Sequence, residues 1–159
     1  MRTILKKILS PIIQTVFKIY TLKTRTFTYQ SITVLVHPEI FPPQFTLSTK
    51  LLLKFIKPLD FTNKKVLELG CGSGIISLYC AKKGAEVTAS DINKKALESL
   101  KLSSKNNNLN INIVYSDLFE NIVQNTYDYI IINPPYYPKT PTNNKEKAWY
   151  CGPWTSISP

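Results

Sequence analysis

The chain has 159 residues, the size of one domain, and 43% of them are hydrophobic, which is enough to bury a core and argues against disorder. Three cysteines and one histidine, with no Cys-x-x-Cys spacing, argue against a zinc site and fit a reduced, cytoplasmic location. No apolar run reaches membrane-spanning length, and no cleavable signal is evident. The formal net charge of +10 favours an anionic partner, or else reflects a Lys-rich composition spread over a solvated surface.

Residues 4–20 place apolar side chains at helical spacing, with an interruption at Ser10-Pro11 and a surround of Lys and Arg. We expect an amphipathic helix, or two short ones. Three roles stay open for this segment: it packs on the domain, lies on an acidic membrane surface, or meets an anionic substrate.

A β-hairpin is expected over residues 26–36, which alternate in polarity and have Gln30-Ser31 between their two halves. The Pro-rich stretch that follows contains His37, which we interpret as a loop residue. A helix is then expected to begin at Ser48 or Thr49, either of which can cap it, and to run to about Lys57.

The second half of the chain alternates strand and helix patterns. Strands are expected over Lys65–Leu69, Glu86–Ser90, Asn110–Tyr115 and Tyr127–Ile132, and helices over Ser73–Lys83 and Asn93–Lys105. This order predicts an α/β fold with a parallel, doubly wound sheet in which the first and fourth of these strands lie side by side. The fourth run is apolar on both faces, which is typical of a buried parallel strand.

A glycine-rich loop follows the first of these strands, with Gly70, Gly72 and Gly74 in five residues after the acidic Glu68. Glycines let the main chain turn sharply and let a ligand approach it, and the loop leads into the N-terminus of a helix. The Lys of a P-loop is absent, and Ile75 stands where a dinucleotide fingerprint needs Gly or Ala.

Polar residues also end the other three strands. Asp91 is placed to accept hydrogen bonds from ribose hydroxyls, or else it only favours a helix N-terminus. A carboxylate at Asp117 could accept from an adenine amino group, with Leu118 or Phe119 against the ring. The fourth strand ends in a stiff corner that offers an amide oxygen and a backbone carbonyl as acceptors, formed by Asn133-Pro134-Pro135-Tyr136.

Together these motifs resemble the S-adenosylmethionine-dependent N-methyltransferases with an Asn-Pro-Pro-Tyr motif, especially the release-factor glutamine methyltransferases and the small-domain RNA methyltransferases. The resemblance runs from about Ile32 to about Tyr137 and includes Phe41-Pro42-Pro43 and the Ser48–Leu52 segment. It implies a Rossmann-like class I fold and S-adenosylmethionine as the cofactor. It also implies that the three glycines hold the methionine part, Asp91 the ribose and Asp117 the adenine, with Glu68, Leu118 and Asn133 also at the cofactor. Asn133 and the Pro134 carbonyl would hold the target amino group, beside Pro135 and Tyr136.

The resemblance implies three further strands, but only 23 residues follow Tyr136. We therefore expect a sheet that is incomplete on its C-terminal side, with a fourth strand that is exposed or covered by a partner chain. The expected divisions are an N-terminal extension over 1–45, a methyltransferase core over 46–137 and an irregular tail over 138–159. The substrate is expected to be a protein glutamine or an RNA or DNA base. A non-catalytic fragment that binds cofactor or RNA is the alternative from another class.

Overall fold

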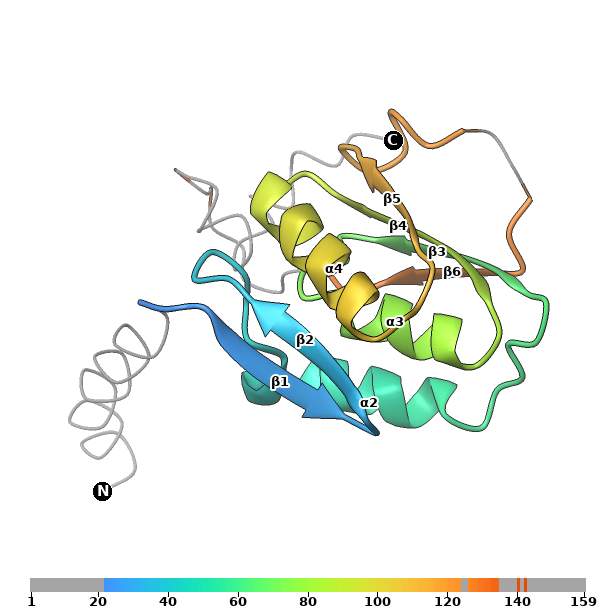
Figure 1. Cartoon of the computed structure of the whole chain (residues 1–159). Coiled ribbons are helices and arrows are strands. Elements are labelled where there is room, and N and C mark those ends of the chain that lie inside the picture. Colours follow the sequence, from blue (N-terminus) through green and yellow to red (C-terminus); the bar gives the residue numbers. More distant parts are fainter. Residues whose placement is uncertain (1–21, 124–125, 135–139, 141, 143–159) are drawn as a thin grey trace, which may run out of the picture.

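The computed structural model of the chain describes residues 22–123, 126–134, 140 and 142 (Figure 1). The helix expected over residues 4–20 and nearly all of the tail expected over 138–159 lie outside the described residues. No helix in the described part is long and apolar enough to cross a membrane. The elements run in the order β1 (Arg25–Tyr29), β2 (Ile32–Val36), the 3-10 helix η1 (Pro43–Phe45), α2 (Leu47–Ile56), β3 (Lys65–Leu69), α3 (Ile75–Lys82), β4 (Glu86–Asp91), α4 (Lys94–Asn106), β5 (Asn112–Tyr115) and β6 (Tyr129–Ile132).

A four-stranded parallel sheet forms the centre of the fold, in the order β5-β4-β3-β6. Strand β3 is internal: Val66 pairs with Val87 of β4 on one side and with Tyr129 of β6 on the other. This order confirms the parallel α/β prediction and the neighbouring positions of β3 and β6. Because all four strands run the same way, the loops that follow them open on one edge of the sheet.

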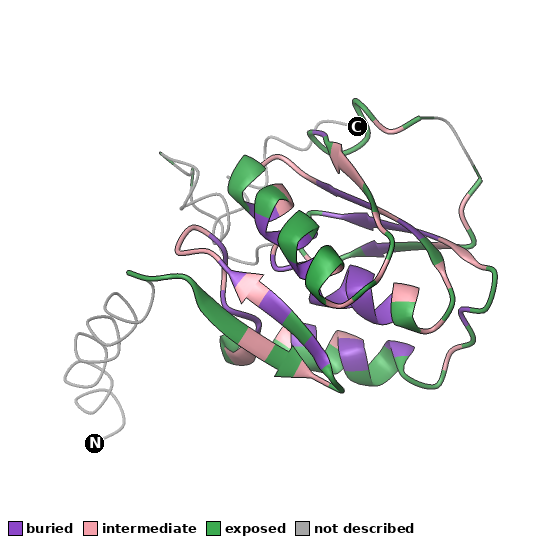
Figure 2. Cartoon of the chain, viewed as in Figure 1, coloured by how far each residue is buried: buried purple, intermediate pink, exposed green. Residues whose placement is uncertain are grey.

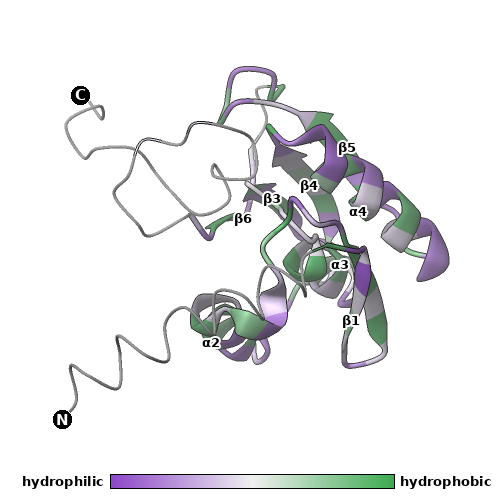
Figure 3. Cartoon of the chain, turned by 90° about the vertical axis from the view of Figure 1, so that its left-hand side faces the viewer, coloured by the Kyte–Doolittle hydropathy of each residue, from purple (hydrophilic) through white to green (hydrophobic). Residues whose placement is uncertain are grey.

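Helices α2, α3 and α4 lie on one face of this sheet, as the turned view shows (Figure 3). Their buried side chains share a single core with alternate strand residues, among them Val66, Val87, Ala89 and Ile131. Helix α3 is buried over most of its length, between the sheet and the hairpin (Figure 2). A doubly wound sheet carries helices on both faces, whereas the described residues place them on this face alone.

The β1–β2 hairpin packs against α3 and α4. The turn was correctly located, since Gln30 and Ser31 both have positive φ, as a two-residue hairpin turn requires. Side chains at the C-terminal end of α4 satisfy the outer edge of β2. Asn107, which directly follows the helix, accepts from the Thr33 N–H at 3.0 Å and donates to the Thr33 carbonyl at 2.7 Å. Ser103 Oγ accepts from the Leu35 N–H at 2.9 Å. These bonds fix the strand that leads directly into the segment bordering the site.

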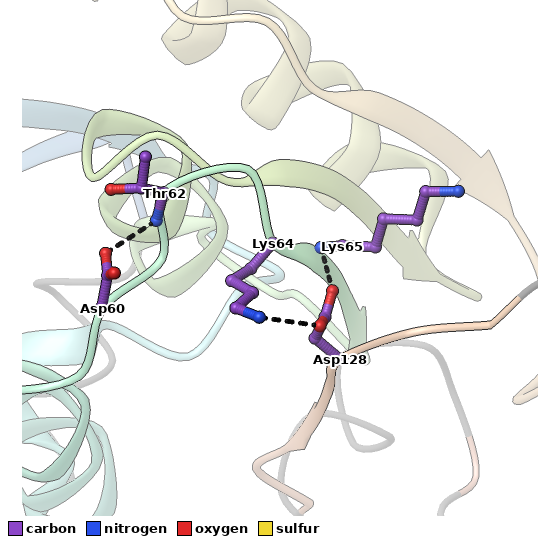
Figure 4. Close-up of polar contacts among 5 residues, drawn as sticks. All are labelled: Asp60, Thr62, Lys64, Lys65 and Asp128. Atoms are coloured by element: carbon purple, nitrogen blue, oxygen red, sulfur yellow. Dashed lines mark hydrogen bonds and ion pairs between the residues drawn. The ribbon is translucent and has the colours of Figure 1, made fainter.

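Strand β6 is an edge strand of the described sheet, as expected for a sheet that is incomplete on its C-terminal side. Its two apolar faces had indicated burial on both sides, but only one face is covered in the described part of the chain. Ile131 is buried in the core, but Ile130 and Ile132 on the opposite face are 52% and 51% exposed. The carboxylate of Asp128 fixes the start of the strand, because it accepts from the Lys65 N–H at 2.8 Å and from Lys64 Nζ at 3.2 Å (Figure 4). These bonds pair the beginnings of β6 and β3.

The observed first residues of α2, α3 and α4 can be compared with the starts expected from the sequence. The cap expected at Ser48 or Thr49 was wrong: α2 begins at Leu47 after an extended Thr46, whose N–H closes the 3-10 helix onto the Pro43 carbonyl. Helix α3 begins two residues later than expected, because Gly74 precedes it in a left-handed conformation. The cap at Asn93 is confirmed, since its side chain accepts from the Lys95 N–H at 2.9 Å.

Candidate active site

A cleft of about 850 Å³ opens above the carboxyl ends of the four parallel strands. Its floor is the glycine loop after β3, and its sides are the residues that follow β4, β5 and β6. The remaining wall is formed by residues between Glu39 and Leu51, which lie in the segment after β2 and in the first half of α2. A volume of this size is that of a cofactor or substrate site. The residues after four separate strands therefore border one space, as the strand order predicted.

The glycine loop exposes main chain to this cleft at its first two glycines. Gly70 and Gly72 both have left-handed φ values, of 69° and 50°. A Cβ added to Gly70 would meet no atom within 4 Å, and one added to Gly72 would meet only Ile40 Cγ2 at 3.8 Å. The space above these residues is thus free for a ligand, and a side chain there would occupy it.

Gly74 lies outside the cleft lining and serves packing instead. Its φ is 72°, and an added Cβ would overlap the side chain of Leu100, 3.1 Å from Cγ and nearer still to Cδ1. Leu100 is fully buried in α4. The third glycine therefore lets α3 begin close against α4, whereas the first two face the cleft.

Asp91 joins two loops at the edge of the cleft. Its carboxylate accepts from the Gly72 N–H and from the Asn93 N–H, both at 2.8 Å. Burial raises the pKa of Asp91, and the bonds from Asn93 and Gly72 oppose that rise. Each carboxylate oxygen has a second lone pair, so Asp91 can hold the loop and still accept from ligand hydroxyls.

Glu68 closes the loop from below. Its Oε2 accepts from the Ser77 N–H at 2.9 Å and also contacts the Ser77 hydroxyl. Because the side chain is fully buried, its pKa rises from an ordinary 4.5 to about 8, although the two bonds from Ser77 lower it. Glu68 thus joins the end of β3 to the first turn of α3, and the residue is among those that border the cleft.

A compact turn after β5 places Asp117 and Leu118 at the cleft. The buried hydroxyl of Ser116 organises this turn: it donates to the Leu118 carbonyl at 2.9 Å and accepts from the Asn121 N–H at 3.0 Å. Leu118 has a positive φ of 46° and is 64% exposed. Phe119, the other expected ring contact, does not line the cleft.

Asn133 and Pro134 line the cleft beyond the end of β6, next to the glycine loop on the end of β3. The side-chain Nδ2 of Asn133 donates to Thr49 Oγ1 at 3.2 Å. Pro135 and Tyr136 lie outside the described residues. The structure therefore brings the described half of the Asn-Pro-Pro-Tyr corner to the same cleft as the glycines and both acids.

The wall between Glu39 and Leu51 was missed as part of the site. It contributes Ile40, Phe41 and Thr49, and the exposed apolar side chains of Phe45, Leu47 and Leu51 at the rim. The likeness of Phe41-Pro42-Pro43 and Ser48–Leu52 to the family was the available signal. It marked the segment as preceding the domain, and nothing in the sequence pattern places it against Asn133.

The charge of the cleft is opposite to that of the chain. Among the described residues that line it there are four acids and no Lys or Arg, although the chain carries a net charge of +10; the acids are Glu39, Glu68, Asp91 and Asp117. The described residues contain no cluster of metal-ligating side chains. Burial raises the pKa of the Cys71 thiol, so the thiol in the loop is a poor nucleophile.

A comparison with known protein families identifies the family to which a chain with this cleft belongs. The family description "methyltransferase small domain" matches residues 31–148. The chain belongs to this family. The match begins in the hairpin and runs through the glycine loop and the Asn133 corner, so the resemblance drawn from those motifs is confirmed.

Relatives of this methyltransferase small domain act on protein and on RNA. A Methanocaldococcus jannaschii protein assigned as an N5-glutamine methyltransferase is 44% identical over 119 residues, covering 74% of this chain and 56% of that protein. The release factor glutamine methyltransferase of Streptococcus pneumoniae is 46% identical over 77 residues, covering 47% of this chain and 27% of the relative.

Among solved structures, the T. thermophilus 16S rRNA N2 G1207 methyltransferase, in complex with AdoMet and guanosine, matches with a TM-score of 0.63 and 25% identity. The matched region covers 72% of this chain and 33% of the T. thermophilus protein. The likeness confirms the class I methyltransferase fold. The chain spans from about a quarter to just over half the length of these three proteins.

Proposed function

We propose that this chain binds S-adenosylmethionine and transfers a methyl group to the side-chain amide nitrogen of a protein glutamine. The observation that carries the proposal is the joint position of the glycine loop and Asn133 at the ends of adjacent strands, in one cleft. The glycines would hold the cofactor, and Asn133 would hold the acceptor nitrogen beside it.

The cleft suits this cofactor in shape and charge. The open space above Gly70 and Gly72 is large enough for a ligand to lie on bare main chain. Three of the acids around that space, Glu39, Asp91 and Asp117, favour a ligand with positive charge, whereas the raised pKa of Glu68 favours its neutral form. S-adenosylmethionine carries a sulfonium and an ammonium group beside one carboxylate. Asp91 would accept from the ribose hydroxyls and Asp117 from the adenine, with Leu118 against the ring.

Bound S-adenosylmethionine supplies an electrophilic methyl group. The residues of the chain must then orient a weak nucleophile, since the lone pair of an amide nitrogen is delocalised into its carbonyl. The side-chain oxygen of Asn133 and the Pro134 carbonyl would accept the two N–H groups and turn the lone pair toward the methyl group. Such positioning by fixed acceptors requires no strong base.

The relatives favour glutamine as the acceptor, because one with 44% identity is assigned as an N5-glutamine methyltransferase and one with 46% identity is a release factor glutamine methyltransferase. An RNA base is the second candidate, favoured by the net charge of +10 and by the likeness to an rRNA methyltransferase. We place the activity in the cytoplasm, in keeping with the free thiols of Cys71 and Cys80. We further propose that a partner chain covers β6, where Ile130 and Ile132 are half exposed.

Transfer of a labelled methyl group from S-adenosylmethionine tests the function and separates the substrates. A purified recombinant release factor and an unmodified small-subunit rRNA transcript serve as acceptors. We expect label on the protein. Label on the RNA alone would replace glutamine with a base, and label on neither, with cofactor binding intact, would favour a binding fragment.

Asn133→Ala should lower the rate of transfer about a hundredfold or more and leave cofactor affinity nearly unchanged. The substitution removes the side-chain oxygen that would accept from the substrate N–H, and it keeps the glycine loop that would hold the cofactor. Asn110→Ala, an exposed asparagine outside the cleft, is the matched control. If Asn133 only holds the corner together, its substitution will instead lower the melting temperature and the cofactor affinity together. Near-normal turnover by Asn133→Ala would remove the residue from the mechanism.

A further inference from the structure

The outer face of α2 carries large apolar side chains that the described residues leave exposed. Leu47, Leu51 and Phe55 follow one another at intervals of four residues, so they lie along one side of the helix over about 12 Å. They are 70%, 56% and 70% exposed. The opposite side of α2 packs into the core through Leu53 and Ile56 (Figure 2). The three exposed residues, which we call the α2 stripe, are therefore not needed to hold α2 on the domain.

Lysines lie along one flank of the α2 stripe, and the helix contains no acid. Lys50 and Lys54 are exposed and one turn apart, and Lys57 follows directly after the helix. No described acid forms an ion pair with any of the three lysines. The outer face of α2 is thus apolar along its centre and positive along its margin. Such a face favours a partner that offers apolar and acidic residues together.

The α2 stripe begins at the candidate active site. Leu47 and Leu51 border the cleft, whereas Phe55 lies further along the helix, beyond the cleft lining. On the inner side of the same helix, Thr49 Oγ1 lies 3.2 Å from Asn133 Nδ2. A macromolecule that places an acceptor group beside Asn133 can therefore rest on the stripe at the same time.

Charge and position distinguish the molecules that could cover the stripe. A nucleic acid would use the lysines but would set phosphates and water against the leucines. An acidic membrane suits a basic amphipathic helix, but it has no group to place in the cleft. Residues 4–20 of this chain, and the same face of a second copy, carry lysines themselves and would meet those of α2 with like charge. These comparisons favour a protein with an acidic and partly apolar surface.

We propose that the α2 stripe and its flanking lysines form a docking surface for the protein that supplies the acceptor glutamine. The surface of that protein near the glutamine carries apolar residues with acidic residues beside them. Docking holds the substrate through residues outside the reaction, so it strengthens binding and leaves the chemical step unchanged. The role of the partner as methyl acceptor rests on the proposed function, whereas docking itself can be measured by binding alone.

Calorimetric titration of the full chain with purified release factor tests docking without any methyl transfer. We expect Leu51→Ser and Phe55→Ser each to weaken binding about tenfold. Lys50→Glu should weaken it by a similar factor, and this loss should shrink as the salt concentration rises. Leu102→Ser and Lys101→Glu change exposed residues of α4 and are the matched controls, which should bind as the wild type does.

The other occupants of the stripe would give different results, each of which overturns the proposal. A fall in melting temperature for Phe55→Ser would show that part of this chain covers the stripe. A wild-type dimer that Phe55→Ser dissociates would show that a second copy does. Weakened binding of Phe55→Ser to the small-subunit rRNA transcript, or to vesicles of phosphatidylcholine and phosphatidylserine, with no effect on the release factor, would assign the face to RNA or to a membrane. A release factor that does not bind, or that binds the wild type and the stripe variants alike, also overturns docking.

Methyl transfer separates docking from the proposed function. With the intact release factor, Phe55→Ser should raise KM about tenfold and leave kcat unchanged. With a short peptide that contains the glutamine and cannot reach the stripe, Phe55→Ser should change neither constant, and an equal effect on both acceptors would overturn docking. Absence of transfer by the wild type, together with release-factor binding that Phe55→Ser weakens, would reject the proposed function and support docking.

Discussion

Substitution of Gly74 by alanine tests whether the three glycines have separate tasks. An alanine at position 74 would need a left-handed backbone at φ 72°, which costs about 1–2 kcal/mol. Its Cβ would also overlap Leu100, a fully buried side chain with little room to move. Overpacking of this kind adds about 1–3 kcal/mol. We therefore expect Gly74→Ala to lower the free energy of unfolding by about 2–5 kcal/mol.

Gly70→Ala is the matched comparison, because its φ of 69° is nearly the same but its added Cβ meets no atom within 4 Å. It should lose only the backbone contribution, about 1–2 kcal/mol. Urea unfolding followed by circular dichroism measures both variants under the same conditions.

A double-mutant cycle isolates the steric part. In a Leu100→Ala background the overlap no longer exists, so adding Gly74→Ala should cost only the backbone strain. Equal destabilisation by Gly70→Ala and Gly74→Ala, or full additivity with Leu100→Ala, would refute the assignment of Gly74 to packing.

Two further predictions concern the floor of the cleft. Burial raises the pKa of Glu68 from 4.5 to about 8, so folding favours its protonated form. The contribution of this group to the free energy of unfolding is therefore fully present below pH 4.5 and is lost as the pH rises through 8. The free energy of unfolding falls by at most about 1.4 kcal/mol per pH unit over this range. Urea titrations from pH 4 to 9 should therefore show a weaker decline for Glu68→Gln than for the wild type, and parallel curves would contradict the burial argument. Gly72→Val should abolish S-adenosylmethionine binding in calorimetry, because its side chain would enter the ligand space; an unchanged affinity would show that the cofactor does not lie on this loop.

The sequence predicted the parts of the fold that depend on local pattern. Strand β3 was located correctly at Lys65–Leu69, because an apolar run ends at a glycine loop. The Asn93 cap was also correct, since an asparagine before a helical pattern is a strong signal. The family motifs brought Asp91, Asp117 and Asn133 to strand ends, and the parallel order of the sheet then placed those ends at one cleft.

Long-range contacts could not be predicted in this way. Thr46, Ser48 and Thr49 can all cap a helix, and the choice of Thr46 is made by the closure of the chain onto Pro43. An apolar run such as β6 does not reveal whether one or both of its faces are covered. The sequence pattern likewise does not distinguish Gly70 from Gly74. They differ because Gly74 packs against Leu100, 26 residues further along the chain, whereas Gly70 faces open space.

The hydrogen bonds between α4 and β2 have a consequence for association between chains. An unpaired strand edge is a template for a further strand, whether from domain swapping or from aggregation. Asn107 offers Thr33 both a donor and an acceptor, as a neighbouring strand would, and Ser103 satisfies the next N–H along. This edge of the hairpin is thus closed to strand addition by side chains at the C-terminal end of α4, and association through sheet extension is directed to the other edge strands of the described part, β1, β5 and β6.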